Sequence, residues 1–345
     1  MAHPLDRPLT LGVALDGAGG GFTAADHVRA VRLAEDAGLD FAALGDSLTG
    51  VSRPDALLTL AAVAPHTRRI GLVPTVTVTH TEPFHVSKAV ASLDFASRGR
   101  AGWWVEVSRT GSDARAVGRR PTAPGEELWA EATAVADVVS RLWDSWEDGA
   151  EIRDTATGRF VDRDRLHYVD FEGPGWSVRG PSITPRPPQG RPPVVVRAED
   201  DHALATAAVA ADVVVVTSGT LGAVRERCLR VREEVAAAGR DRDGVFVLAE
   251  VRAHLARGGP GPDRAGAGLV HTGSPGALAE ALLEWGRVVD GFVVGFGSTD
   301  EDLPLFTERT VPLLRESGVL REGDGPRTLR DRLGLARPDS RYGAG

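Results

Sequence analysis

The chain has 345 residues, of which 42% are hydrophobic and 26% are charged, so it has enough apolar material for a buried core and lacks the composition of a disordered protein. Its 40 basic and 48 acidic side chains give a formal net charge of −8, and the scatter of the basic residues argues against nucleic acid or an anionic membrane as the main partner. No apolar run approaches the ~20 residues of a membrane-spanning helix, and the first residues lack the pattern of a signal peptide, so we predict a cytoplasmic location.

Short apolar or β-branched runs alternate along the chain with longer segments of helical spacing. Strands are predicted over residues 9–15, 40–46, 70–78, 101–107, 192–198, 212–216, 244–251 and 290–296. Helices are predicted over residues 24–37, from 53 onward, 83–97, 124–146, from 199 to 210, 221–238, 275–285 and 303–317. Residues 149–191, rich in proline, glycine and charge, form an insertion before the fifth strand, and a loop follows residue 251.

This alternation favours an α/β fold in which the whole chain, 1–345, forms a single (β/α)8 TIM barrel. An open, doubly wound sheet is the alternative. The dinucleotide-binding pattern G-x-G-x-x-G is incomplete after the first strand, because Gly17 and Gly19 fit but Phe22 stands in place of the third glycine. We therefore interpret this glycine-rich segment as a flexible loop at the barrel mouth.

Active sites of such barrels lie at the carboxyl ends of the strands, so polar residues at those ends are candidates for chemistry. The sequence places there Asp46, Thr77, Glu106, Ser108, Arg197, Asp200 and Asp201. His80 and His85 do not have a recognised metal-ligand spacing, and no metal site is predicted. The single cysteine, Cys228, lies on a predicted helix and is interpreted as a buried thiol without a catalytic role.

Several segments carry a family resemblance, among them GLDFAALGDSL, GRAGWWVEVS, LWDSWED and PRPPQGRP. In these segments the chain resembles the luciferase-like flavin-dependent monooxygenases, in the branch of nitrilotriacetate monooxygenase and dibenzothiophene-sulfone monooxygenase. The resemblance covers almost the whole chain. It implies a bacterial-luciferase-like barrel that uses reduced FMN, supplied by a separate flavin reductase, and dioxygen to oxidise a small organic substrate. It also implies a dimer, either of two identical chains or with a related subunit.

The resemblance assigns roles to three residues that match the family pattern. Asp46 falls where the family places an acid close to the flavin. Thr77 falls on the family's hydroxyl position at the end of the third strand, and Ser108 matches the serine that ends the GRAGWNVVTS segment. These three residues are therefore expected to contact the cofactor.

Other positions depart from the family pattern. Trp104 replaces an asparagine, and the family's flavin-contacting histidine and tyrosine correspond to Pro124 and Leu128. The Ala-Gly-Ser-Ser turn that receives the phosphate corresponds to Ala198, Glu199, Asp200 and Asp201. Carboxylates oppose phosphate at a helix N-terminus, at about 4 kcal/mol per close like-charge contact. Alternatively, Asp200 and Asp201 cap the helix with their side chains turned away from the ligand.

These observations leave three hypotheses open. The first is a reduced-flavin-dependent monooxygenase. The second is a relative with a degenerate flavin site that acts as a non-catalytic partner subunit or small-molecule binder, with Trp104 filling the space of the ring. The third is catalysis without flavin, in which Glu106, Asp200 or Asp201 acts as acid or base. The sequence does not identify the substrate.

Overall fold

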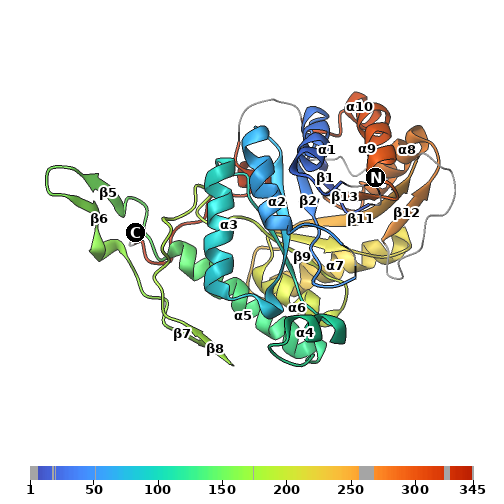
Figure 1. Ribbon diagram of the computed structural model, residues 1–345. Coiled ribbons are helices and arrows are strands. Elements are labelled where there is room, and N and C mark those ends of the chain that lie inside the picture. Colours follow the sequence, from blue (N-terminus) through green and yellow to red (C-terminus); the bar gives the residue numbers. More distant parts are fainter. Residues whose placement is uncertain are drawn as a thin grey trace.

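The computed structural model describes residues 7–17, 19, 21–50, 52–173, 175–255, 268–321 and 327–343. Eight parallel strands close into a barrel surrounded by helices (Figure 1), which confirms the predicted (β/α)8 fold. Each strand pairs with two neighbours, and the pairing of β10 with β11 completes the circle. In order around the barrel the strands are β1 (Thr10–Ala14), β2 (Phe41–Leu44), β3 (Gly71–Thr77), β4 (Trp103–Glu106), β9 (Val194–Arg197), β10 (Val213–Val216), β11 (Phe246–His254) and β13 (Gly291–Phe296).

Most of the helices that cover the barrel begin at a residue whose side chain accepts a hydrogen bond from a backbone amide of the first turn. The main helices are α1 (Ala24–Asp36), α2 (Ala56–Val63), α3 (Pro83–Ser97), α5 (Gly125–Asp144), α6 (Asp201–Ala210), α7 (Leu221–Ala237) and α8 (Pro275–Trp285). The prediction that the second helix opens at Arg53 was wrong by three residues. Asp55 is the cap, and its carboxylate accepts a hydrogen bond from the Leu58 amide at 2.7 Å.

Several elements around the barrel differ from the predicted ones. The last barrel helix is split into α9 (Thr299–Leu305), a π-helical turn (Phe306–Thr310) and α10 (Val311–Glu316). A short helix, α4 (Gly111–Val117), follows β4. The loop predicted after residue 251 instead contains the end of β11 and its partner β12 (Leu269–Thr272), while residues 256–267 of that loop lie outside the described residues.

The barrel interior follows the two-residue period of its strands. Alternate residues of β2, β4 and β11, including Phe41, Trp104 and Phe246, point inward and pack into one apolar cluster. The short helix α11 (Leu329–Leu333) contributes Leu329 and Leu333 to the same cluster. A Cβ at Gly71, the first residue of β3, would lie 2.6 Å from Leu329. The C-terminal segment therefore closes the amino end of the barrel and leaves the carboxyl end for a site.

The insertion between α5 and β9 forms two hairpins that project away from the barrel (Figure 1). One pairs β5 (Glu151–Asp154) with β6 (Arg159–Val161), and the other pairs β7 (Phe171–Gly173) with β8 (Trp176–Val178). These strands are three or four residues long, and of their residues only Val178 is buried. In Figure 1 they lie to one side of the barrel, and none of their residues lines the cavity described below.

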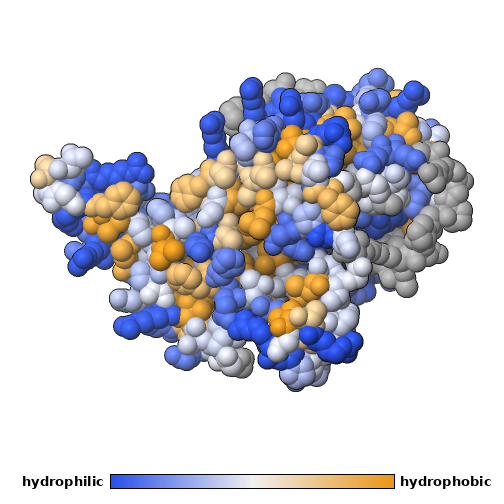
Figure 2. All heavy atoms as spheres, viewed as in Figure 1, coloured by the Kyte–Doolittle hydropathy of each residue, from blue (hydrophilic) through white to orange (hydrophobic). Residues whose placement is uncertain are grey.

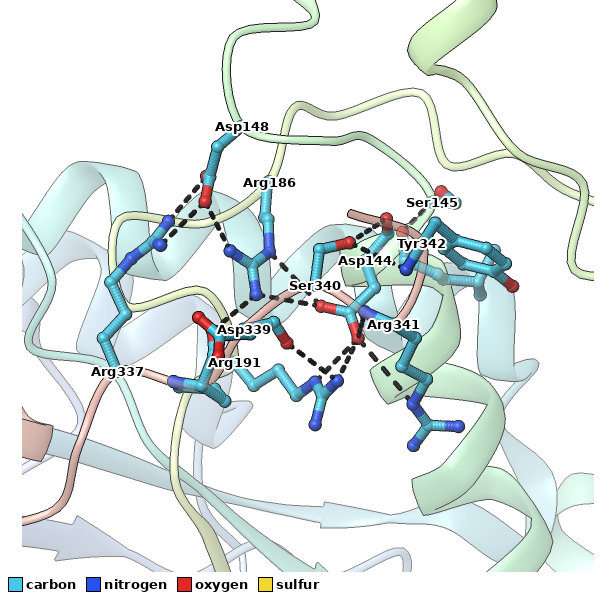
Figure 3. Close-up of polar contacts among 12 residues, drawn as sticks. Asp144, Ser145, Asp148, Arg186, Arg191, Arg337, Asp339, Ser340, Arg341 and Tyr342 are labelled. Atoms are coloured by element: carbon cyan, nitrogen blue, oxygen red, sulfur yellow. Dashed lines mark hydrogen bonds and ion pairs between the residues drawn. The ribbon is translucent and has the colours of Figure 1, made fainter. Parts of the chain in front are cut away.

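A buried carboxylate, Asp144 at the end of α5, joins the insertion and the C-terminal segment to the barrel (Figure 3). Its side chain is 0% exposed and forms ion pairs with Arg186 at 3.2 Å, with Arg191, and with Arg341 at 3.7 Å. Arg186 also pairs with Asp148 at 2.7 Å. Because the arginines come from the insertion and from the last residues described, this cluster connects three segments that are distant in sequence.

No helix in the described ranges is both long enough and apolar enough to span a membrane.

Candidate functional site

A cavity of about 460 Å³ opens at the carboxyl ends of the barrel strands. This volume lies within the range of small-molecule sites, about 300–1,000 Å³. Small and apolar residues form one part of its wall, and charged residues form the rest. It is lined by Ala14, Asp16, Ala43, Gly45, Asp46, Ser47, Thr49, Gly50, Arg53, Thr75, Trp104, Glu106, Arg197, Glu199, Thr217, Glu250, Arg252, Val293 and Gly295.

Four of the charged residues, Glu106, Arg197, Glu250 and Arg252, occupy inward positions near the carboxyl ends of their strands. Along β11 the inward residues are apolar at Phe246 and Leu248 and then charged at Glu250 and Arg252. The same change from apolar to charged occurs on β4 and on β9, where Glu106 and Arg197 each stand two residues beyond an apolar inward side chain. Buried charges persist when they are paired, and ion pairs satisfy that condition for Glu106, Arg197 and Glu250.

Arg197 is at the centre of this charged layer. Its Nε lies 3.0 Å from a carboxylate oxygen of Glu250, and its Nη1 lies 3.7 Å from Glu106. The guanidinium also stacks over Trp104, with Cζ 4.9 Å from the ring centroid. The two carboxylates raise the pKa of Arg197 even though burial opposes its charge. Arg197 is therefore charged at every physiological pH and forms a cationic floor above the indole.

Burial raises the pKa of the Glu106 carboxyl above the usual range despite the opposing effect of Arg197. The folded state therefore disfavours ionised Glu106, and stability is lost as the pH rises from the usual glutamate pKa of about 4.3 through the raised value. We expect Glu106→Gln to raise the Tm at neutral pH and to leave it unchanged near pH 4. Thermal unfolding across that range tests this expectation, and a lower Tm at neutral pH would contradict it.

The other two lining arginines differ in how they are paired. Arg53 lies 3.5 Å from Asp16 and donates to the Gly45 carbonyl at 3.3 Å. Arg252 donates to the Phe296 carbonyl at 3.1 Å and forms no ion pair with any residue in the described part of the chain. Arg252 is thus the one lining guanidinium without a carboxylate partner among the described residues.

The loop after β2 is fastened across the mouth to the loop after β4. The Thr49 hydroxyl donates a hydrogen bond to Asp113 and also contacts the Ser112 hydroxyl of α4 at 3.2 Å. Asp113 also accepts from the Ser108 hydroxyl at 3.0 Å. These bonds connect the two loops at one side of the pocket.

The structure brings only some of the predicted site residues together. Asp46 and Trp104 line the pocket, whereas Thr77, Ser108 and the two aspartates before and at the start of α6 do not. Both Asp46 oxygens accept backbone amides, from Ser47 at 2.7 Å and from Ala56 at 3.1 Å. Trp104 is 4% exposed and belongs to the barrel core, so it forms the floor of the cavity and does not fill it.

The remaining predicted residues have local partners. Thr77 is half-buried at the end of β3, where its carbonyl accepts from the Thr81 hydroxyl at 3.0 Å. The Ser108 amide donates to the Thr79 hydroxyl at 2.9 Å. Asp201 is exposed and pairs with Arg230 at 2.8 Å.

The start of α6 does not suit a phosphate. Asp200 is its cap, and one carboxylate oxygen accepts from the Ala203 amide at 2.8 Å while the other pairs with Arg109 at 3.0 Å. Glu199 pairs with the same Arg109. The amide that a phosphate would use is thus already bound to a carboxylate, and the local guanidinium is taken. The cavity fits a planar ring by size, but the residues after β9 do not fit a flavin phosphate.

Sequence reasoning missed four charged lining residues, namely Asp16, Arg53, Glu250 and Arg252. A usable signal existed for Glu250 and Arg252, because they continue the inward alternation of β11 beyond its apolar residues. Asp16 and Arg53 belong to loops, whose approach to the mouth depends on tertiary structure.

Two further side chains from the sequence analysis have no role in this pocket. Cys228 is buried on α7, and burial raises the pKa of its thiol to about 12. Burial lowers the pKa of His80, which does not line the cavity. Within the described residues, no three histidine, cysteine or acidic side chains are grouped so that they could hold a metal ion.

A closed parallel barrel with a polar pocket at the carboxyl ends of its strands is the arrangement of (β/α)8-barrel enzymes. Residues 9–259 match the family model described as luciferase-like monooxygenase. The chain belongs to this family.

Three curated relatives show the range of the family. Nitrilotriacetate monooxygenase component A of Aminobacter aminovorans is 36% identical over 67% of this chain, and the match spans 55% of that relative's length. One of the chains of pristinamycin IIA synthase of Streptomyces pristinaespiralis is 31% identical over 95% of both chains. N-acetyl-S-(2-succino)cysteine monooxygenase of Bacillus subtilis (strain 168) is 28% identical over 90% of both chains.

Among solved structures, the fold is similar to that of a riboflavin lyase, with a TM-score of 0.86, 22% identity and coverage of 97% of this chain and 98% of the other. At this level of identity the similarity concerns the fold.

Proposed function

We propose that this chain is a luciferase-like monooxygenase that uses reduced flavin and dioxygen to oxidise a small organic molecule in the barrel-mouth pocket. The family match and the monooxygenase names of its relatives support the reaction type. The observation that supports this location of the reaction is the cavity of about 460 Å³ at the carboxyl ends of the strands. When bound there, reduced flavin supplies the electrons that activate dioxygen.

The chain's own residues would bind and shield the ring. Trp104 and Arg197 form a rigid floor, because the guanidinium stacks on the indole and is held by two carboxylates. Arg252 could neutralise negative charge on a reduced ring, since it has no carboxylate partner among the residues described. The Thr49 and Asp113 contact restrains the loop above this floor and helps to exclude water.

The charge of the lining also bears on the substrate. Five carboxylates and three guanidinium groups face the cavity, and two of the three guanidiniums already pair with lining carboxylates. This excess of negative charge supports a neutral or cationic organic substrate and disfavours a polycarboxylate. Nitrilotriacetate, which names one relative, is therefore not a proposed substrate of this chain.

The proposal is tested by supplying reduced flavin from a flavin reductase in air, with a panel of neutral sulfides, amines and nitrilotriacetate. We expect mass spectrometry to detect a product with one added oxygen atom from a neutral or cationic compound and none from nitrilotriacetate. The reductase alone is the control. Oxidation of nitrilotriacetate would contradict the assigned substrate class, and the absence of any oxygenated product across the panel would count against the proposed activity.

A flavin reductase is the proposed partner, as the words "component A" in the name of one relative support. We further propose a dimer formed through α2 and α3, where Leu58 is 68% and Phe95 is 44% exposed. Figure 2 shows apolar residues gathered over these helices. Light scattering is expected to give twice the chain mass, and Leu58→Glu is expected to reduce it to one chain mass. A monomeric mass for the unaltered chain would contradict the dimer.

A second candidate function is that of a chain that works only together with a related chain. The self-capped start of α6 and the full-length similarity to one chain of a synthase favour it. Binding of reduced flavin to the isolated chain distinguishes the two functions. The monooxygenase would bind it alone, whereas a chain that works only with a related chain would not.

A further inference from the structure

Each helix that begins beside the pocket has its N-terminus capped by a side chain. Four α-helices begin within four residues after a pocket-lining residue, namely α2, α6, α7 and α9. Helix N-termini bind phosphate through free backbone amides and a partial positive charge. In each of these four helices, a side chain accepts the amide that would otherwise be free.

Two of the four caps are carboxylates. Asp55 accepts from Leu58 at 2.7 Å on α2, and Asp200 accepts from Ala203 at 2.8 Å on α6. The other two caps are Thr220 and Ser298, which accept from amides at 3.3 Å on α7 and α9. The first turn of α9 also carries three acids, Asp300, Glu301 and Asp302. A phosphate approaching any of these helices would meet a capped amide, and at three of them it would also meet negative charge.

The positively charged side chains near α6 do not offset this effect. Arg109 is shared between Glu199 and Asp200, and Arg230 pairs with Asp201. Arg227 donates to the backbone carbonyls of Ala198 and Glu199, at 2.6 and 3.1 Å. These guanidiniums are engaged with the protein itself.

From these contacts we infer that the mouth recognises a flavin by its ring system alone and gains no affinity from a flavin phosphate. This inference rests on the proposed flavin-dependent function. It extends that function by assigning the site to the isoalloxazine ring, with riboflavin and FMN as equivalent ligands. The ring lies in the cavity, and the phosphate of FMN remains in solvent.

The test is a pair of fluorescence-quenching titrations of the purified chain with oxidised riboflavin and oxidised FMN. Dissociation constants within about threefold of each other are the expected result, which is a small difference on the affinity scale. If FMN binds at least about tenfold more tightly than riboflavin, the inference is overturned while the proposed function stands. If neither flavin, oxidised or reduced, binds at concentrations up to about 1 mM, the proposed function fails and the inference with it.

A variant isolates the role of the cap. Asp200→Gly frees the Ala203 amide and removes one negative charge, and glycine is tolerated at a helix cap. We expect it to strengthen FMN binding by at least about threefold and to leave riboflavin binding unchanged. Asp201→Asn is the matched control, because it removes a charge from the same helix without freeing an amide, and it should change neither constant. Equal responses of FMN and riboflavin to Asp200→Gly would overturn the inference.

Discussion

Replacing Gly295 with leucine is expected to abolish flavin binding and oxygenation without unfolding the barrel. Gly295 lines the cavity on β13 and lies opposite Arg252 in the strand register. Its backbone is outside the left-handed region, and an added Cβ would meet its nearest atom, Arg252 Cζ, at 3.6 Å, an ordinary contact. The rest of the leucine side chain would occupy the space assigned to the ring, so we expect no flavin binding at concentrations up to about 1 mM.

Gly222→Leu provides the matched control for this variant. Gly222 lies on the exposed side of α7, and no atom lies within 4 Å of the Cβ that the substitution adds. The control should retain wild-type flavin binding, and circular dichroism should show both variants folded. If Gly295→Leu bound flavin as tightly as the unaltered chain, the cavity at the strand ends would not be the flavin site.

The largest loss of stability is expected from Asp144→Ala. The substitution leaves Arg186, whose side chain is 2% exposed, with the more exposed Asp148 as its remaining carboxylate partner, and it removes a partner of Arg191 and Arg341. Breaking a buried ion pair in this way costs about 3–5 kcal/mol. We expect the Tm to fall by about 5–10 °C, together with a lower midpoint in urea.

Asp137→Ala tests whether this loss comes from burial. Asp137 also pairs with Arg341, at 2.7 Å, but its side chain is 34% exposed. Pairs of this kind contribute about 1 kcal/mol or less, so this variant should unfold close to the wild type. Equal losses from the two substitutions would contradict the account of Asp144 as a buried connection between three segments.

The strands of the barrel could be predicted because their information is local. Runs such as DVVVV and PPVVVRA are apolar, β-branched and bounded by polar residues, so each identifies a buried strand without knowledge of its neighbours. The alternation with helices then favours a parallel barrel. The strands of the insertion could not be found in this way, because they are short and exposed and depend on pairing with each other.

The helix that closes the amino end of the barrel was missed for a related reason. α11 spans only Leu329–Leu333, and its two buried leucines matter because the barrel interior receives them. Five residues carry too little periodic pattern to predict a helix. The signal would have been the capping box of Thr328 and Asp331.

The candidate site likewise has a part that the local sequence predicts and a part that depends on tertiary structure. The positions of Glu106 and Arg197 at strand ends predicted that they face the mouth, and both line the pocket. Which side chains pair with which could not be predicted, since Glu250 reaches Arg197 from a strand more than fifty positions further along the chain. Of the two readings of Asp200, the contacts favour the helix cap, because its carboxylate binds the Ala203 amide.

The most direct test of the proposed function is an anaerobic calorimetric titration of the purified chain with reduced FMN. The account predicts that one flavin binds per chain with a dissociation constant in the micromolar range. This corresponds to a binding free energy of about −8 kcal/mol. It also predicts that this binding is lost in Gly295→Leu. No heat of binding up to about 1 mM reduced flavin would contradict the account and would favour a protein whose chemistry takes place on a related chain.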